Sequence, residues 1–192
     1  MSTDLNKEIA KHFLTDARDY LQRYILLREE TNTTMSKRSK LLLDLLFAIE
    51  CNLKALVFIE SCDDEKSTYK KIITHDFEKL IGMLDEQTKS QCTFINKYDL
   101  SKYYVRIRYS LESYIDFRTE LAGVLGEKYY STIADFNWLE NVYQKSKSLL
   151  EYASSKNPPN LEPINLAEID VQSVLDKHAR LRDIRDKKSN KS

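Results

Sequence analysis

The feature that most constrains this chain is an apolar run at residues 41–60, LLLDLLFAIECNLKALVFIE. Apolar residues occur on nearly every side of the helix that this run predicts, so we expect the helix to be packed on several faces. The run is long enough to suggest a membrane span, but Asp44, Glu50 and Lys54 lie inside it. A charge at mid-bilayer costs about 2.5 to 3.5 kcal/mol on insertion scales. The run is therefore interpreted as a central buried helix, with no membrane contact expected.

Glu50 and Lys54 form the most informative charged pair in this run. They are four residues apart with the acid first, which is the favourable order for an ion pair on a helix. The pair lies either on one exposed edge of the helix or inside the core as a polar feature. Charged residues are seldom fully buried, so the exposed edge is the favoured interpretation.

The composition predicts an all-α fold. Three Gly and three Pro in 192 residues are far below average usage, and sheets need more turn residues than this. We expect a bundle of four to five antiparallel helices, followed by a C-terminal linker and a short helix. Helical periodicity places the bundle helices at residues 4–30, 37–59, 68–84, 99–125 and 130–154, with a loop at 85–97.

The C-terminal segment differs in composition from the rest. All three Pro lie within residues 158–163, and the chain ends in a Lys- and Arg-rich stretch. We expect a bundle domain at 1–154, and a linker, a short amphipathic helix and a basic tail at 155–192. A solvated tail is the favoured interpretation. A helix that docks on a protein partner, or a nucleic-acid contact, is the alternative.

Several classes of function find no support in the residues. The N-terminus has no apolar signal region, and the three Cys include no CxxC pair, so we expect a cytoplasmic protein. The formal net charge is zero, so no global attraction to nucleic acid or acidic lipid is expected. No glycine-rich phosphate loop, metal-ligand spacing or nucleophile motif occurs, and we expect no cofactor and no metal. The three scattered His are His12, His75 and His178.

Tyrosine and arginine alternate at the start of the helix expected at 99–125. Tyr103, Tyr104 and Tyr109 interleave with Arg106 and Arg108. Such side chains can stack on bases and bind phosphate. They can equally form the boundary of a helix interface, with ring bodies packed and hydroxyl groups exposed. The boundary interpretation is favoured.

Three short motifs, taken in order, resemble the HEPN superfamily. They are AIECNLKALVFIES at 48–61, THDFEKLIGML at 74–84 and YYVRIRYS at 103–110. The matching positions are Glu50, Leu53, Lys54, Ala55 and Leu56 in the first, His75, Asp76, Phe77 and Leu80 in the second, and Tyr104, Arg108 and Tyr109 in the third. The resemblance covers roughly residues 40–150. It implies a helical bundle, usually dimeric, of the kind found in prokaryotic toxin–antitoxin and defence systems.

The resemblance also implies a test for ribonuclease activity. Many members are metal-independent ribonucleases with an Arg followed four to six residues later by a His. In that pair, Arg stabilises phosphate charge and His transfers a proton. After Arg108 this chain has no such His, and Ser113 and Tyr114 occupy the places where it would be sought. Neither side chain is a comparable proton carrier at neutral pH.

The first functional hypothesis is therefore a HEPN-like, non-nucleolytic protein that binds nucleotide, RNA or a protein partner. Its candidate binding residues are Arg108, Tyr104, Tyr109, His75, Lys54, Glu50 and Tyr114. The alternative is a plain helical interaction module that engages a protein partner through its C-terminal helix. The least favoured is an active ribonuclease that uses an Arg108–Tyr114 pair. We also expect a homodimer, because the central and fourth helices offer more apolar surface than one small bundle covers.

Overall fold

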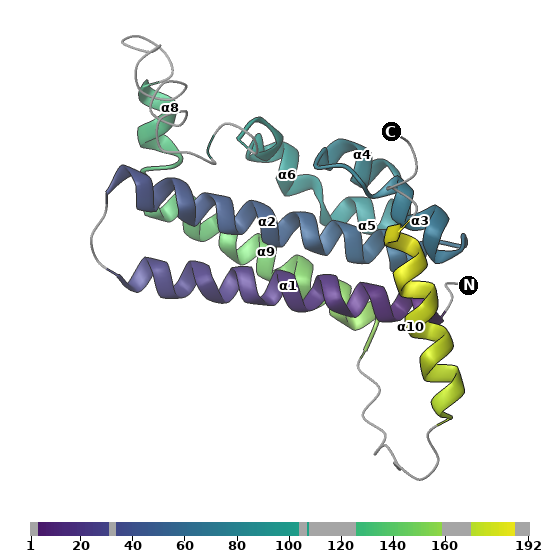
Figure 1. Ribbon diagram of the computed structural model, residues 1–192. Helices are drawn as coiled ribbons and strands as arrows, with labels where there is room; N and C mark the ends of the chain where they lie inside the picture. Colours follow the sequence, from purple (N-terminus) through teal and green to yellow (C-terminus); the bar gives the residue numbers. More distant parts are fainter. Residues whose placement is uncertain (1–3, 31–33, 104–106, 108–125, 159–169, 187–192) are drawn as a thin grey trace, which may run out of the picture.

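The expected all-α fold is confirmed. The computed structural model describes residues 4–30, 34–103, 107, 126–158 and 170–186, and these contain helices and no strand. No helix among them is both long enough and apolar enough to span a bilayer. Their elements, shown in Figure 1, are α1 (Asp4–Glu29), α2 (Met35–Glu60), α3 (Glu65–Lys71), α4 (Phe77–Gly82), α5 (Glu86–Gln91), α6 (Thr93–Lys97), η1 (Leu100–Lys102), α8 (Gly126–Ser131), α9 (Phe136–Lys156) and α10 (Val171–Asp186).

Helix α2 is the centre of the fold, as its apolar run predicts. Its buried side chains point in several directions because α1, α9 and α4 all pack against it. Helix α1 runs antiparallel to α2. The ring centroids of Phe13 and Phe58 lie 6.0 Å apart, and those of Tyr20 and Phe47 lie 5.1 Å apart. Burial of these large apolar surfaces is the main source of stability in such a core.

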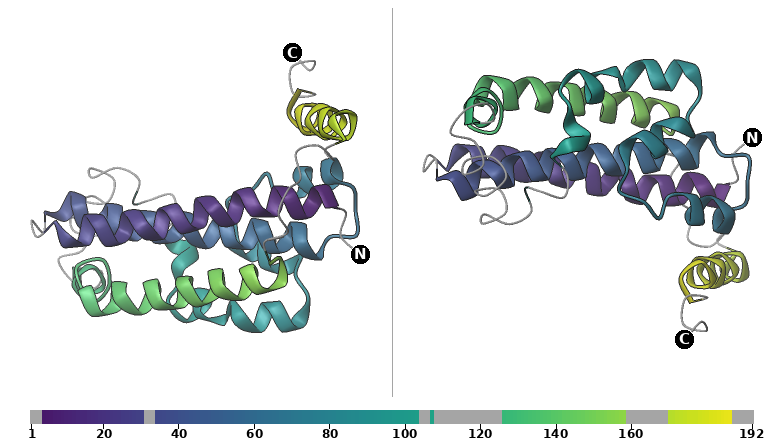
Figure 2. Two further views of the ribbon diagram at one scale, coloured as in Figure 1. Left: turned by 90° about the horizontal axis from the view of Figure 1, so that it is seen from below. Right: turned by 90° about the horizontal axis from the view of Figure 1, so that it is seen from above.

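Helix α9 packs beside α2 and runs in the same direction. At the N-terminal ends, the Arg38 guanidinium lies 5.6 Å from the centroid of the Phe136 ring. At the C-terminal ends, Lys156 pairs with Glu60. Figure 2 shows α1 and α9 lying side by side along the bundle. The connection from α2 to α9 holds the short helices, which cover one side of α2 (Figure 1).

The prediction of one continuous helix at 68–84 is wrong. This segment is divided into α3 and α4, and the expected loop at 85–97 contains the short helices α5 and α6. The reason is local capping. The side chain of Asp76 accepts hydrogen bonds from the backbone N–H groups of Glu78 and Lys79, and Asp85 accepts one from Thr88. Aspartate at such positions starts a new helix and so competes with continuation of the previous one.

The helix expected at 130–154 is also interrupted. Helix α8 ends at Ser131, and α9 begins after Asp135, whose side chain caps it by accepting from the N–H of Asn137. Most of the helix expected at 99–125 lies outside the described residues. Trp138 packs edge-on against Tyr98 and Tyr103, so it is a packing residue at the boundary of the core.

The short C-terminal helix is present as α10. It crosses the end of the bundle near α3, and its N-terminal half extends away from the other helices (Figure 1). The guanidinium of Arg180 donates two hydrogen bonds, of 2.8 and 2.7 Å, to the carboxylate of Glu65 on α3. A weaker ion pair of 3.8 Å joins Lys177 to Glu8 on α1. These charged contacts attach α10 to the bundle.

Candidate functional site

Helix α2 carries the first two candidate site residues one turn apart. The ammonium nitrogen of Lys54 lies 2.6 Å from Oε1 of Glu50, and only 13% and 7% of the two side chains are exposed. The favoured sequence interpretation, an exposed edge, is therefore wrong, and the pair is a largely buried polar feature. The reason is tertiary, because other helices pack against α2 and His75 lies against Glu50. Removing one partner from such a pair would leave a buried charge uncompensated.

His75 joins this pair from the loop between α3 and α4. Its Nδ1 lies 3.0 Å from Oε1 of Glu50, the same oxygen that Lys54 contacts, while 62% of its side chain is exposed. Flanking polar side chains shape the loop. The backbone N–H of Asp76 donates to the hydroxyl of Thr74 at 3.1 Å, and the carboxylate of Asp76 caps α4. Turn chemistry on either side thus holds the imidazole against the carboxylate.

The hydrogen-bond acceptor of this cluster is the Glu50 carboxylate, which both Lys54 and His75 contact. A carboxylate only accepts hydrogen bonds, so Nδ1 of His75 carries the proton that it shares with Glu50. The Glu50–Lys54–His75 cluster thus presents one exposed imidazole, oriented by a buried ion pair. An exposed aromatic ring that is also a hydrogen-bonding group can stack on a base or contact a polar ligand.

The structure does not place the remaining candidate residues. Tyr104, Arg108, Tyr109 and Tyr114 lie outside the described residues. Of the tyrosine and arginine cluster, Tyr103 is described, and it is buried against Trp138. Burial raises the pKa of the Tyr103 hydroxyl, against the lowering effect of a hydrogen bond with Thr132. For this one member the ring is packed, as the favoured boundary interpretation expects, but the residue is only 6% exposed, so its hydroxyl is not on the surface as that interpretation expects.

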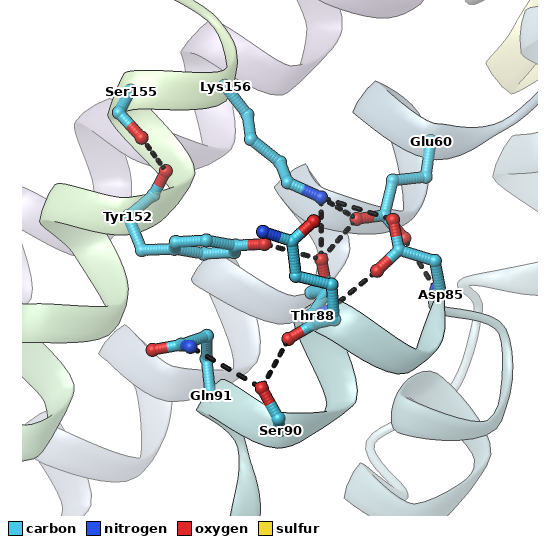
Figure 3. A network of polar contacts seen from close by, with 9 residues as sticks. Glu60, Asp85, Thr88, Ser90, Gln91, Tyr152, Ser155 and Lys156 are labelled. Carbon is cyan, nitrogen blue, oxygen red and sulfur yellow. Dashed lines mark hydrogen bonds and ion pairs between the residues drawn. The ribbon is translucent and has the colours of Figure 1, made fainter.

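A second polar network was missed by sequence reasoning. The ammonium of Lys156 donates to Oε1 of Glu60 at 2.6 Å, to Oγ1 of Thr88 at 2.7 Å and to Oδ2 of Asp85 at 3.2 Å. The hydroxyl of Thr88 also hydrogen-bonds to Glu60 and lies 3.0 Å from the hydroxyl of Tyr152. Figure 3 shows these side chains converging from α2, α5 and α9. The network joins three segments that are distant in sequence.

The electrostatics of this network favour a structural role. Burial lowers the pKa of Lys156, but hydrogen bonds with Glu60, Tyr152 and Asp85 outweigh it and raise the pKa above its ordinary value. A base must lose its proton near the working pH, so this ammonium is unsuited to proton abstraction. Sequence reasoning had only one signal here, the helix cap Asp85 with Thr88 three residues later.

Two of the three thiols are unsuited to nucleophilic chemistry. Burial raises the pKa of Cys51 and of Cys92 to about 12, so both stay protonated at neutral pH. Cys51 is partly buried and packs against the core as a small apolar side chain. Within the described part of the chain, no three His, Cys, Asp or Glu side chains are grouped so that they could hold a metal ion.

No protein-family model matches the chain, and no curated protein or solved structure gives a significant match.

Proposed function

We propose that this chain is a HEPN-like, non-nucleolytic cytoplasmic protein that binds nucleotide or RNA in a bacterial defence or toxin–antitoxin setting. The observation that carries the proposal is the convergence of His75 and Lys54 on one carboxylate oxygen of Glu50. Two of these residues come from the first motif of the resemblance and one from the second. A buried ion pair that holds an exposed imidazole in one position would preorganise that ring for a ligand.

The ligand class follows from the side chains of the motifs. His75 offers a ring edge and a ring face to a base, and a positive charge when it is protonated. In this proposal Arg108 binds a phosphate group, and Tyr104 and Tyr109 stack on bases. The proposal excludes cleavage, because no His follows Arg108 at the spacing of the ribonuclease members.

The proposal is tested by fluorescence anisotropy with a labelled single-stranded RNA, and with ATP as competitor. His75→Ala and Arg108→Ala should each weaken binding by about tenfold, which corresponds to roughly 1.4 kcal/mol. His12→Ala is the matched control, because His12 is an exposed imidazole on α1, outside the motifs. Equal binding by wild type, His75→Ala and Arg108→Ala would contradict the proposal.

The same samples test the absence of cleavage. The RNA recovered after incubation should remain intact on a denaturing gel. RNA cut by the wild type and left intact by Arg108→Ala would instead support the ribonuclease hypothesis.

A plain helical interaction module is the second candidate function. It is favoured by the exposed apolar side chains Val171, Val174 and Leu175 on α10. If neither RNA nor nucleotide binds, and a protein partner is captured through α10, this second function replaces the first.

A further inference from the structure

An open groove lies between α1 and α9, away from the Glu50–Lys54–His75 cluster. Its volume is about 630 Å³. Its apolar lining comes from Leu21 and Ile25 on α1 and from Tyr143 and Leu150 on α9. A groove with this floor suits an apolar side chain or the apolar face of a helix.

The groove is a fixed feature of the fold, because α1 and α9 contact each other beyond both of its ends. Towards one end, Arg28 of α1 forms an ion pair with Glu140 of α9. Towards the other, the side-chain amide of Asn157 donates to the backbone oxygen of Lys7 at 2.8 Å. These contacts fix the separation of α1 and α9 and leave the middle open.

The rim of the groove carries a net positive charge, because two cations and one acid, Glu151, line it. Arg18 on α1 and Lys147 on α9 both line it. Lys147 lies 4.0 Å from Glu151 in a solvent-exposed pair, and such pairs contribute little energy. Arg18 makes no ion pair within the described ranges. An occupant that combines an apolar stripe with an acidic side chain would therefore complement both floor and rim.

The N-terminal half of α10 has this chemistry. Val171, Val174 and Leu175 are spaced to form one helical face, and they are 63%, 42% and 54% exposed. Asp176 flanks this face, held by a hydrogen bond of 2.8 Å from Gln172. This half of α10 extends away from the bundle (Figure 1). The exposed apolar face spans about 6 Å from residue 171 to 175, which fits within the α1 wall of the groove, about 10 Å long from residue 18 to 25.

We propose that the N-terminal half of α10 from a second copy of this chain docks in the α1/α9 groove. Val174 and Leu175 contact the apolar floor, and Asp176 pairs with Arg18 and Lys147. The chain's own α10 does not fill its own groove, because Arg180 attaches it to Glu65 on α3. The docking buries two surfaces that are uncovered in the single chain. It does not depend on the proposed RNA site.

Sedimentation velocity over a concentration series tests this docking. The full chain should form an oligomer, and Leu175→Asp should weaken association by at least about tenfold. Leu26→Asp is the matched control, because Leu26 is 55% exposed on α1 but does not line the groove. A wild type that stays monomeric at the highest reachable concentration would overturn the proposal, and so would equal association of Leu175→Asp and Leu26→Asp.

A charge swap makes the test specific for the two surfaces. Arg18→Glu combined with Lys147→Glu should weaken association, and adding Asp176→Lys to that variant should restore it. All the substituted side chains are exposed, so folding should be retained. Failure of Asp176→Lys to restore association would overturn the proposed pairing.

A cysteine pair separates docking between chains from docking within one chain. Gln22→Cys on the groove and Val174→Cys on α10 are combined with Cys62→Ser, which removes the exposed native thiol. Oxidation with copper–phenanthroline should give a covalent dimer on a non-reducing gel. An internally linked monomer would overturn the proposal, since it would place the chain's own α10 in its groove.

Discussion

The ammonium nitrogen of Lys156 lies 2.6 Å from Oε1 of Glu60, although 96 residues separate the two in the sequence. Each residue is the last of its long helix, α9 and α2 respectively. Because Asp85 and Thr88 join the same ammonium, one side chain connects the ends of two core helices to the short helices between them. The network thus holds the C-terminal ends of α2 and α9 together.

Removing this ammonium should destabilise the fold. In Lys156→Met the carboxylate of Glu60 stays largely buried but loses its charged partner, which should lower the free energy of unfolding by roughly 2 to 3 kcal/mol. Urea unfolding followed by circular dichroism measures this difference. Lys145→Met on the same helix is the control, because Lys145 is exposed and makes no ion pair within the described ranges. If the two substitutions lower the free energy of unfolding equally, Lys156 has no special structural role.

Two buried asparagines should respond oppositely to truncation. Asn6 and Asn52 are both fully buried, but the amide of Asn6 donates to the backbone oxygen of Asp63 at 2.9 Å. Neither polar atom of Asn52 has a hydrogen-bond partner within the described part of the chain. Asn6→Ala should therefore cost about 1 to 2 kcal/mol, whereas Asn52→Ala loses no hydrogen bond to any described residue and gains about 0.5 kcal/mol of helix propensity.

Urea unfolding of the two alanine variants checks this contrast. The Asn52→Ala variant should be as stable as the wild type or slightly more stable. If Asn52→Ala lowers the free energy of unfolding as much as Asn6→Ala does, Asn52 has a hydrogen-bond partner that contributes to stability, and the predicted contrast is wrong.

The attachment of α10 should weaken in acid. Burial raises the pKa of Glu65, but hydrogen bonds from Arg180 outweigh it and leave the pKa below its ordinary value of 4.5. A lowered carboxyl pKa contributes stability above the unfolded value, and this stability is lost as the pH falls through the folded value. We therefore expect the protection of α10 amides from hydrogen exchange to fall as the pH drops below about 4.5.

Substitution of the partner residue should remove this pH dependence. Arg180→Ala should reduce protection of α10 about fivefold near neutral pH, which corresponds to about 1 kcal/mol for a partly exposed pair. Arg182→Ala on the same helix is the control, because Arg182 is exposed and has no ion pair within the described ranges. Protection factors, which correct for the intrinsic pH dependence of exchange, are the readout. Unchanged protection in Arg180→Ala would contradict this account of the attachment.

Helices α1 and α2 could be predicted from sequence, whereas the short helices between α2 and α9 could not. An apolar run on all sides of a helix leaves few alternatives, so α2 was predicted within about two residues at its start and one at its end. The divided region at 68–84 keeps an apolar helical period across the break. Only the capping bonds of Asp76 reveal that the chain starts a new helix there.

The candidate site could be predicted only in part. The Glu50–Lys54 pair follows directly from its spacing, whereas the family resemblance, and not a local pattern, singled out His75. Burial of the pair depends on how other segments pack against α2, which no local pattern encodes. The Lys156 network was missed for a related reason, because its partners lie 68 to 96 residues from the lysine.

The most direct test of the proposed recognition site is an NMR titration of the histidine side chains. The chain has three His, so selective imidazole labelling gives three resolvable reporters. Addition of single-stranded RNA or ATP should shift the His75 ring signals saturably and leave those of His12 and His178 nearly unchanged. Unchanged His75 signals at saturating ligand, or equal small shifts of all three, would contradict a binding site at the Glu50–Lys54–His75 cluster.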